Sequence, residues 1–348
     1  MSDIVLGIET SCDETAVAVL TSDSQVLAHE VFSQSDHSAF GGVVPEIAAR
    51  AHFEVLPAIV QNSMKTADLS FSDLSCIAVT AGPGLVGSLI VGVMFAKAVA
   101  FTMEKPIIPV NHLEAHALVA RMLYDVKFPF LVLIISGGHC QFMLAHGVGN
   151  YTKLGCTIDD SLGEAFDKVS RMLGLSYPGG PSVEEKALKG EGSKYFFPRA
   201  LNKRPGCDFS FSGLKTAVRT AIEKAGALDE QVVCDICASF QECVGEILSS
   251  KIKRAAIAAR ELCNGDVNTL VVTGGVASNN FLRSIIALCV EEVGFSVVFP
   301  PRELCTDNGI MVAWAGLENL RLGKNISYSL EFAPRARWPL ECLHPKHV

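Results

Sequence analysis

The run Ile4-Val5-Leu6-Gly7-Ile8-Glu9 begins the part of the sequence that decides the fold. Its apolar residues predict a buried strand, the polar residues Thr10–Thr15 predict a turn, and Ala16–Leu20 predicts a returning strand. A third strand is expected around Val26–Phe32, and Pro45 stands where it can open a helix. This part of the sequence therefore predicts a three-stranded meander followed by a helix.

The same order of elements returns later in the chain. Phe130–Ser136 predicts a buried strand, Gly137-Gly138 a tight turn and Cys140–Leu144 the returning strand. A third strand near Thr152–Cys156 precedes a helix expected from Asp160 to Leu173. Because strands and helices then alternate in both halves, the duplication predicts an α/β protein with two similar lobes around a cleft.

The domain boundaries follow from this duplication. Residues 1–125 are expected to form the N-terminal lobe, residues 126–306 the C-terminal lobe, and residues 324–348 a tail. The stretch around 176–263 is largely helical, which predicts an insertion into the second lobe. The last helix, 307–323, is expected to pack back between the lobes.

Composition places the chain among well-buried globular proteins. It has 348 residues, of which 49% are hydrophobic and 19% charged. The twelve cysteines show no regular spacing and the N-terminus shows no export signal, so a reducing cytoplasm is expected. The apolar run Leu85–Met103 approaches membrane-spanning length, but Lys97, Gly87 and Gly92 interrupt it and Gly84 precedes it. A closely packed helix is therefore expected there and no membrane contact.

Two histidines at helical spacing, His112 and His116, predict a metal site. They project from one helix face, one turn apart, and can bind a single transition-metal ion. Glu114 lies about 200° round the helix from His112, so it does not stand where H-E-x-x-H zinc peptidases place their base. The alternative is a pair of ordinary surface or core histidines.

Asp307 precedes the last helix in the segment Cys305-Thr306-Asp307-Asn308. If that helix crosses back toward the first lobe, Asp307 completes a His-His-Asp set suited to iron or zinc. Capping of the helix N-terminus is the alternative role for this segment.

Three loops follow apolar strands and can present backbone N–H groups to phosphates: Thr10–Thr15, Ser136–His139 and Gly274–Asn279. In the first, Asp13 and Glu14 form an acidic pair that suits Mg²⁺ or a nucleophile, with turn capping as the alternative. A carboxylate at Asp167 is placed to accept hydrogen bonds from ribose hydroxyls.

The segment between residues 186 and 204 is basic, although the whole chain has a net charge of −8. Lys194, Arg199, Lys203 and Arg204 lie there beside three aromatic residues, a pattern that suits RNA. A solvated loop is the alternative.

Nine motifs together resemble the TsaD family of tRNA threonylcarbamoyl transferases, from about residue 3 to residue 340. They are Gly7–Thr15, Gly41–Glu46, His112–His116, Ile135–His139, Gly163–Lys168, Tyr177–Pro181, Phe209–Lys215, Gly274–Asn279 and Cys305–Asn308. The sequence departs from the family at Ser161-Leu162 and at Cys140, and neither departure is expected to touch a ligand.

The resemblance implies a fold and a reaction. The fold is the actin-like ATPase (ASKHA, duplicated RNase H-like) fold with two lobes. The reaction transfers a threonylcarbamoyl group from threonylcarbamoyl-AMP to N6 of adenosine 37, in tRNAs that read codons beginning with A. A metallopeptidase, an actin-like ATPase or kinase, and a non-catalytic scaffold are the alternatives.

The resemblance also implies site residues, cofactors and partners. The metal ligands are His112, His116 and Asp307, with Fe²⁺ preferred over Zn²⁺. ATP with Mg²⁺ is a second possible nucleotide, and tRNA, TsaB-like and TsaE-like proteins and a TsaC-type adenylate-forming enzyme are the implied partners. The acidic pair lies near the reactive group, and the adenylate is held by Ile134, Ile135, Ser136, Gly137, Gly138, Asp167, Gly180 and Asn279.

Overall fold

The computed structural model describes residues 2–34, 37, 42–323 and 330–343. Gly41 of the predicted motif, and residues 324–329 and 344–348 of the predicted tail, lie outside the described residues. The chain divides into two compact units. Unit 1 comprises residues 1–126, 147–150 and 306–348, and unit 2 comprises residues 127–146 and 151–305.

Unit 1 is built on a mixed five-stranded sheet of order β3-β2-β1-β4-β5. β1 pairs antiparallel with β2 and parallel with β4, which in turn pairs parallel with β5. The predicted meander is therefore confirmed. The elements are β1 (Ile4–Glu9), β2 (Glu14–Thr21), β3 (Val26–Ser33), α1 (Pro45–Thr66), η2 (Phe71–Asp73), β4 (Cys76–Gly82), α2 (Val86–Thr102), β5 (Ile107–Asn111), α3 (His112–Leu123), α10 (Gly309–Arg321) and η4 (Leu340–Cys342).

Unit 2 repeats this topology in a second five-stranded sheet of order β10-β9-β6-β7-β8. β6 pairs antiparallel with β7 and parallel with β9, as β1 does with β2 and β4. The predicted duplication is thus confirmed. The elements are β6 (Phe130–Ile135), β7 (Cys140–Gly147), β8 (Asn150–Cys156), α4 (Leu162–Met172), α5 (Gly179–Ala187), α6 (Ser212–Ala225), α7 (Glu230–Leu262), β9 (Thr269–Thr273), η3 (Gly275–Ser278), α8 (Asn280–Glu292), β10 (Ser296–Val298) and α9 (Arg302–Cys305).

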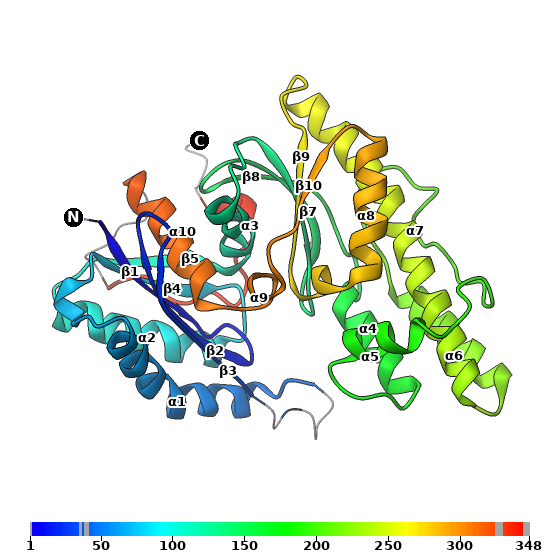
Figure 1. Cartoon of the computed structure of the whole chain (residues 1–348), viewed down its shortest axis with the longest axis horizontal. Coiled ribbons are helices and arrows are strands. Elements are labelled where there is room, and N and C mark those ends of the chain that lie inside the picture. The colour runs from blue at the N-terminus through cyan, green and yellow to red at the C-terminus, as the bar shows by residue number, and fades with distance from the viewer. Residues whose placement is uncertain (1, 35–36, 38–41, 324–329, 344–348) are drawn as a thin grey trace. The chain divides into compact units, whose positions relative to one another are not determined.

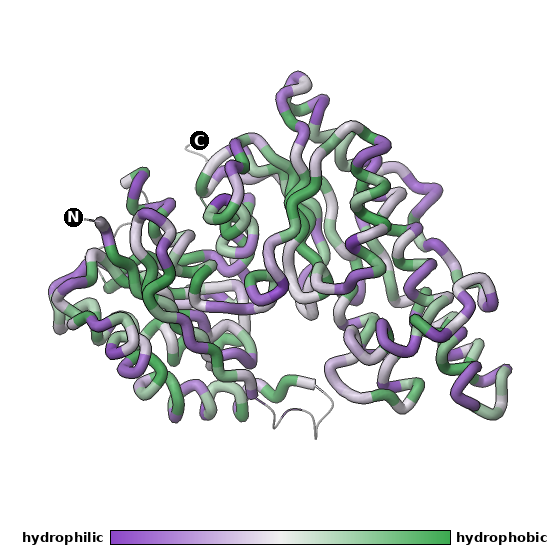
Figure 2. The backbone as a smooth tube through the Cα atoms, viewed as in Figure 1, coloured by the Kyte–Doolittle hydropathy of each residue, from purple (hydrophilic) through white to green (hydrophobic). Residues whose placement is uncertain are grey.

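The core of unit 1 follows from strand alternation, because successive side chains point to opposite faces of a sheet. Leu6 and Ile8 of β1 pack with Leu56 and Val60 of α1, so α1 and α2 cover one face (Figure 1). Figure 2 shows hydrophobic residues along the strands of both sheets. Gly7, between these two residues, faces α10 instead.

α10 lies unusually close to the sheet of unit 1. A Cβ built on Gly7 would stand 2.5 Å from the amide nitrogen of Ala313, and one on Gly309 would stand 2.5 Å from that of Ala18. The three glycines Gly7, Gly309 and Gly316 therefore permit this contact. The structure groups α10 with unit 1, on the sheet and beside α3. The expected packing of residues 307–323 between the lobes stays a prediction.

Within the predicted tail, the described residues 330–343 contact elements of unit 1. The Asn111 amide donates to the carbonyl of Trp338 at 2.8 Å, and Lys97 donates to the carbonyl of Phe332. These contacts attach the described residues 330–343 to β5 and α2.

The stretch predicted as a helical insertion contains α5, α6 and α7 in unit 2. α7 is 33 residues long, and its buried side chains join one core with those of β6, β7 and α4. Among the described residues, no helix has both the length and the apolar character that crossing a membrane requires.

Candidate metal centre and nucleotide-binding turn

α3 begins directly after β5, and its first turn is fixed by Asn111. The Asn111 side chain accepts hydrogen bonds from the backbone N–H groups of Leu113 and Glu114, which caps the helix. His112 and His116 are both buried on this helix, with ring centroids 4.7 Å apart. The expected pair of imidazoles on one helix face is therefore present.

Asp307, just before α10, brings a carboxylate to these imidazoles within unit 1. Its Oδ1 lies 3.5 Å from His112 Nε2 and 3.1 Å from His116 Nε2. One ligand atom from each residue lies within 4.8 Å of the others. Metal–ligand bonds of about 2.0–2.2 Å place neighbouring ligand atoms roughly 3–3.5 Å apart. The donor set fits a single divalent ion.

Glu9, the last residue of β1, holds the ring of His112. Glu9 Oε2 lies 3.1 Å from His112 Nδ1 and accepts from the Thr80 hydroxyl at 2.5 Å. Glu9 Oε1 accepts from the Ser11 N–H at 2.5 Å. A carboxylate on Nδ1 leaves the lone pair of Nε2 for a metal. Sequence reasoning missed Glu9, although an acidic residue ending an otherwise apolar strand was a signal.

The charges of this cluster depend on one another. Burial by itself would raise the pKa of Glu9, but the charge and hydrogen bond of His112 hold it below its usual value. Burial by itself would lower the pKa of His112, but Asp307 and Glu9 raise it to about 9. Without a metal, the cluster therefore retains a proton on His112 near neutral pH.

The acidic pair Asp13-Glu14 follows the turn after β1, and both residues are half-buried. Burial, together with the charges of Asp307 and Asp13, raises the pKa of Glu14 to about 9. The Ser11 hydroxyl of the same turn lies 3.2 Å from Nδ1 of His112, so the turn that precedes the acidic pair contacts the metal-ligand set.

Glu114, on the same helix, contacts the backbone of residues 147–150. It is buried, and its Oε1 accepts a hydrogen bond from the Gly149 N–H at 2.6 Å. This carboxylate is thus engaged with the backbone of residues 147–150, in agreement with the expectation that it does not serve as a peptidase base.

In unit 2, the glycine turn after β6 is open. Gly137 and Gly138 are exposed, and a Cβ on either would meet no atom within 4 Å. The side chains of Ile134 and Ile135 are fully buried, so these two residues offer only backbone groups to a ligand. Ser136 closes the turn, with its N–H donating to the carbonyl of His139 at 2.7 Å.

Ser161 was expected to contact none of the residues proposed to bind a ligand. That expectation is wrong, because Ser161 contacts Gly137. Its hydroxyl donates to the Gly137 carbonyl and accepts from the Glu164 N–H, because the N-cap of α4 lies directly behind the turn. The Gly163 N–H donates to the Ser136 carbonyl at 3.1 Å. The start of α4 therefore holds the predicted adenylate turn in place.

The other predicted adenylate residues shape the backbone of unit 2. Asp167 Oδ1 accepts from the Gly179 N–H at 2.8 Å, which fixes the start of α5 beside Gly180. The Asn279 side chain accepts from the Leu282 N–H and donates to Gln241 Oε1 at 2.7 Å. Asn279 is buried, so its side chain caps α8 and supports the nearby surface.

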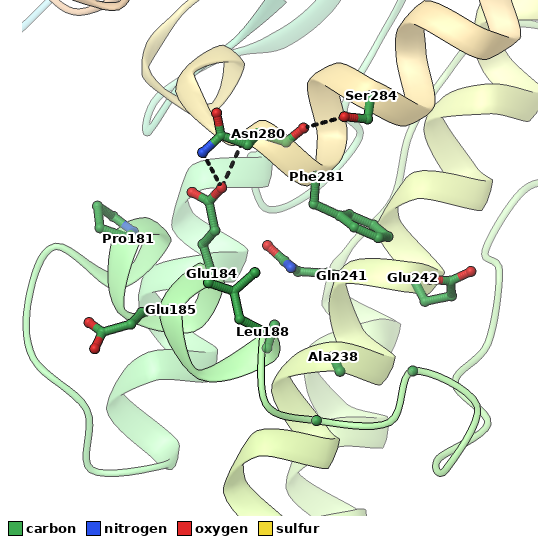
Figure 3. Close-up of a pocket in the computed structure, with 13 residues that line it drawn as sticks. Pro181, Glu184, Glu185, Leu188, Ala238, Gln241, Glu242, Asn280, Phe281 and Ser284 are labelled. Carbon is green, nitrogen blue, oxygen red and sulfur yellow. Dashed lines mark hydrogen bonds between the residues drawn. The ribbon is translucent and has the colours of Figure 1, made fainter.

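A pocket of about 650 Å³ adjoins Gly180 and Asn279 through their neighbours Pro181 and Asn280. It lies among α5, α7 and α8, and Figure 3 shows the Phe281 ring and Leu188 beside it. Glu184 Oε1 accepts from the backbone N–H and side-chain amide of Asn280, at 2.7 and 3.0 Å (Figure 3). The lining of the pocket combines apolar side chains with polar ones, which include the glutamates Glu184, Glu185 and Glu242.

Comparisons with known proteins identify the family. The family model described as "TsaD: tRNA N6-adenosine threonylcarbamoyltransferase" matches residues 25–314. The chain belongs to this family. A tRNA N6-adenosine threonylcarbamoyltransferase from Anaplasma phagocytophilum is 70% identical over 99% of this chain and 100% of its own length. The protein of the same name from Ehrlichia chaffeensis is 56% identical, over 98% of this chain and 97% of its own length.

Solved structures support the fold of this tRNA N6-adenosine threonylcarbamoyltransferase family member. HypF from T. kodakarensis gives a TM-score of 0.59 at 16% identity, over 92% of this chain and 48% of that one. A full-length HypF in the phosphate- and nucleotide-bound form also gives 0.59, at 13% identity over 92% and 56%. The α/β fold is thus of the actin-like ATPase type, with two units of the same topology.

The charged side chains of the basic segment before α6 differ in their contacts with the rest of unit 2. Lys194, Lys203 and Arg204 are exposed, whereas Arg199 is bound to both carboxylate oxygens of Glu246, at 2.7 and 2.8 Å. Arg199 also stacks 4.6 Å from the ring centroid of the exposed Phe196. Arg199 therefore forms its ion pair with a residue of α7.

Side chains of α7 donate hydrogen bonds to the backbone of this segment. The buried Lys251 donates to the carbonyls of Leu201 and Gly206, at 3.0 and 3.3 Å. Arg254 donates to the carbonyls of Asn202 and Arg204. The loop that carries Lys203 and Arg204 is consequently fixed in place, while these two side chains stay in solvent.

Proposed function

We propose that His112, His116 and Asp307 hold one divalent metal ion beside the threonylcarbamoyl group during its transfer to tRNA. As a member of its family, the chain is a transferase that modifies N6 of an adenosine in tRNA. The convergence of the three ligand atoms on one point carries the metal proposal. Fe²⁺ is the preferred ion and Zn²⁺ the alternative.

The proposed donor is threonylcarbamoyl-AMP and the acceptor is adenosine 37 of tRNAs that read codons beginning with A. The N6 amine forms a bond to the carbamoyl carbon, the bond from that carbon to the phosphate oxygen breaks, and AMP leaves. The amine loses one proton in this step. Its lone pair is delocalised into the base, so it needs both orientation and a proton acceptor.

Residues of unit 1 meet these needs. When bound, the metal supplies Lewis acidity that orients and polarises the carboxylate, hydroxyl or carbonyl of the threonylcarbamoyl group. Glu9 keeps Nε2 of His112 directed at the ligand position. Asp13 or Glu14 orients the amine or accepts its proton. Because the pKa of Glu14 is raised to about 9, this carboxyl group is protonated near pH 7 and accepts the proton only after it has ionised.

Residues of unit 2 receive the adenylate in this proposal. The open backbone of Ser136–Gly138 faces the phosphate, and the pocket beside Gly180 and Asn279 takes the nucleoside, with Asp167 at the ribose. A dehydratase activator solved with bound ADPNP has the same fold, with a TM-score of 0.51 at 13% identity over 93% of this chain and 99% of that one. Its nucleotide supports this use of the fold. ATP with Mg²⁺ is the second nucleotide that we propose to bind at this turn.

The decisive experiment is the double variant His112→Ala/His116→Ala in a reconstituted reaction with threonine, bicarbonate, ATP, a TsaC-type enzyme, partner proteins and unmodified tRNA. Modified nucleosides are measured by mass spectrometry and metal content by elemental analysis. We expect both to be lost together. The control is His146→Ala, which removes a half-buried histidine of unit 2 that contacts Thr152. Unchanged turnover in the double variant would refute the metal role.

The surface around Lys203 and Arg204 is the proposed contact for the tRNA backbone, with Lys194 and the Arg199–Phe196 stack beside it. Charge reversal in Lys203→Glu/Arg204→Glu should weaken tRNA binding and reduce its salt dependence by about one to two released counterions. Lys224→Glu, at an exposed lysine of α6, is the matched control. Equal affinities and salt slopes in both variants would exclude this surface.

Protein partners complete the proposal: a TsaB-like protein, a TsaE-like protein and the TsaC-type supplier of the adenylate. Support for a partner comes from α2, where Val86, Ile90, Met94 and Phe101 are exposed along one helix face. Apolar stripes of this kind are typical of surfaces that contact another protein. The cytoplasm is the proposed compartment, in keeping with twelve free cysteines.

A further inference from the structure

His52 is a buried histidine of α1 whose two ring nitrogens both contact the chain around the acidic pair. Its Nδ1 lies 2.7 Å from the hydroxyl of Thr15, and its Nε2 lies 2.9 Å from the carbonyl oxygen of Cys12. These contacts stand immediately before and after Asp13-Glu14. His52 is fully buried, so solvent replaces neither contact.

The partners of His52 determine where its proton resides. A carbonyl oxygen only accepts, so Nε2 carries the proton and donates to Cys12. In the neutral ring Nδ1 then accepts from the Thr15 hydroxyl. Burial lowers the pKa of His52, which favours this neutral form. Each nitrogen therefore has a single direction of hydrogen bonding, and the ring acts as a clamp across the loop.

α2 holds the first part of the same loop. The Leu85 N–H donates to the Ser11 carbonyl at 2.8 Å, and the Thr10 hydroxyl donates to the Ser88 carbonyl at 3.0 Å. The section from Cys12 to Thr15 also has backbone contacts, since the Ser88 hydroxyl donates to the Cys12 carbonyl at 3.4 Å and the Gln34 N–H donates to the Asp13 carbonyl at 3.3 Å. His52 is the side chain that joins the residues on either side of the acidic pair. The Ser11 hydroxyl of the same loop lies 3.2 Å from Nδ1 of His112, so this loop contacts the metal-ligand set directly.

We propose that His52 is a positioning residue for the transfer reaction: by clamping Cys12 and Thr15 it fixes Asp13 and Glu14 relative to the metal ligands. This inference rests on the proposed roles of that acidic pair. A shift of about 1 Å in a group that orients a nucleophile lowers turnover by up to about 100-fold. Loss of the clamp should therefore reduce kcat far more than the KM for tRNA.

The test removes the clamp through Thr15→Val, which cannot donate to Nδ1, and restores it through Thr15→Ser. Thr21→Val, at the other end of β2, is the matched control, since the Thr21 hydroxyl contacts Gln25 and Asp23, away from the acidic pair. Two quantities are measured: kcat in the reconstituted reaction, and the alkylation rate of Cys12 in the protein alone by peptide mass spectrometry. Buried Cys76 serves as an internal reference.

We expect Thr15→Val to lower kcat by about 10- to 100-fold and to accelerate alkylation of Cys12, with the alkylation of Cys76 and the metal content unchanged. Thr15→Ser should restore both quantities, and Thr21→Val should change neither. In an Asp13→Asn/Glu14→Gln background, Thr15→Val should have little further effect on kcat, because coupled residues are non-additive. If Thr15→Val does not fold, His52→Gln, which keeps a donor for Cys12, undergoes the same measurements with the same expectation.

Different experimental results would overturn the role of His52 and the proposed acid–base role of Asp13 and Glu14. Wild-type alkylation of Cys12 or wild-type kcat in Thr15→Val overturns the inference, and so does an undiminished effect of Thr15→Val in the doubly substituted background. The acid–base role itself fails when Asp13→Asn and Glu14→Gln keep full kcat while Thr15→Val still accelerates alkylation of Cys12.

Discussion

The turn between β1 and β2 and the turn between β6 and β7 occupy the same place in two sheets of the same topology, yet their chemistry differs. In the first, Thr10 and Ser11 are buried and side chains hold the loop from several directions. In the second, Gly137 and Gly138 stand open to solvent. Duplication thus preserves the backbone path, while the residues at its tip decide whether the turn presents titratable side chains or bare N–H groups.

The residue that ends each first strand shows the same contrast. β1 ends in Glu9, which is buried and bound to His112, whereas β6 ends in Ile135, which is buried in an apolar core. The carboxylate that ends the first strand of unit 1 therefore has no counterpart at the end of β6. Titratable groups should govern the properties of unit 1, and backbone packing those of the turn in unit 2.

The largest expected difference is in the pH dependence of the metal-free protein. Asp307 and Glu9, against the effect of burial, raise the pKa of His112 to about 9, above its value of about 6.5 in the unfolded chain. This stabilisation is fully present below pH 6.5 and is lost as the pH rises through 9, by about 3 kcal/mol. The raised pKa of Glu14 acts in the same direction.

Denaturant unfolding of the chelated protein at pH 6.5 and pH 9 measures this loss, and hydrogen exchange locates it. Peptides of unit 1 should lose protection at high pH, while peptides around Gly137 should not. Because His112 must lose its proton to bind a metal, the apparent metal affinity should rise about tenfold per pH unit up to about pH 9. Equal losses in both units would contradict the comparison.

Glu9→Gln tests the carboxylate that distinguishes the two turns. A glutamine amide can donate to Nδ1, which leaves the proton on Nε2 and removes the lone pair that faces Asp307. We expect metal affinity to fall by about 10- to 100-fold, measured by competition with a chelating dye. The matched control is Glu114→Gln, whose oxygen can still accept from Gly149, and it should bind metal as the wild type does. Equal affinities in the two variants would count against a role for Glu9.

The sequence was sufficient for the strands and the duplication, and it singled out the three residues of the His112, His116 and Asp307 cluster, whose role as metal ligands stays a prediction. His112 and His116 share a helix, so their proximity follows from spacing alone, whereas their meeting with Asp307 depends on α10 lying on the sheet. Glu9 and His52 were missed because their partners lie 103 and 37 residues away, respectively. Periodicity reports which face of an element is buried and does not report which polar groups meet there.

Gly163→Ala tests whether packing governs the turn of unit 2. A Cβ at Gly163 would stand 2.8 Å from the Cα and backbone nitrogen of Gly137, so the turn must shift. We expect a stability loss of about 1–3 kcal/mol and weaker binding of AMP by calorimetry. Gly138→Ala, where a Cβ has open space, is the control and should not lower stability. A similar loss in both variants would show that flexibility, and not close packing, determines the turn.

The smallest expected effect belongs to Ser161, which links the cap of α4 to the Gly137 carbonyl. Ser161→Ala removes an N-cap and should cost about 1 kcal/mol of stability, with AMP affinity reduced roughly threefold to fivefold. The control is Asp229→Ala, which removes the N-cap of another helix of unit 2, α7. Oδ1 of Asp229 accepts a hydrogen bond from the Val232 N–H at 2.8 Å. Both variants should melt at a lower temperature, but only Ser161→Ala should weaken AMP binding. If both weaken it equally, general destabilisation explains the effect, and the hydroxyl of Ser161 has no separate role in holding the turn.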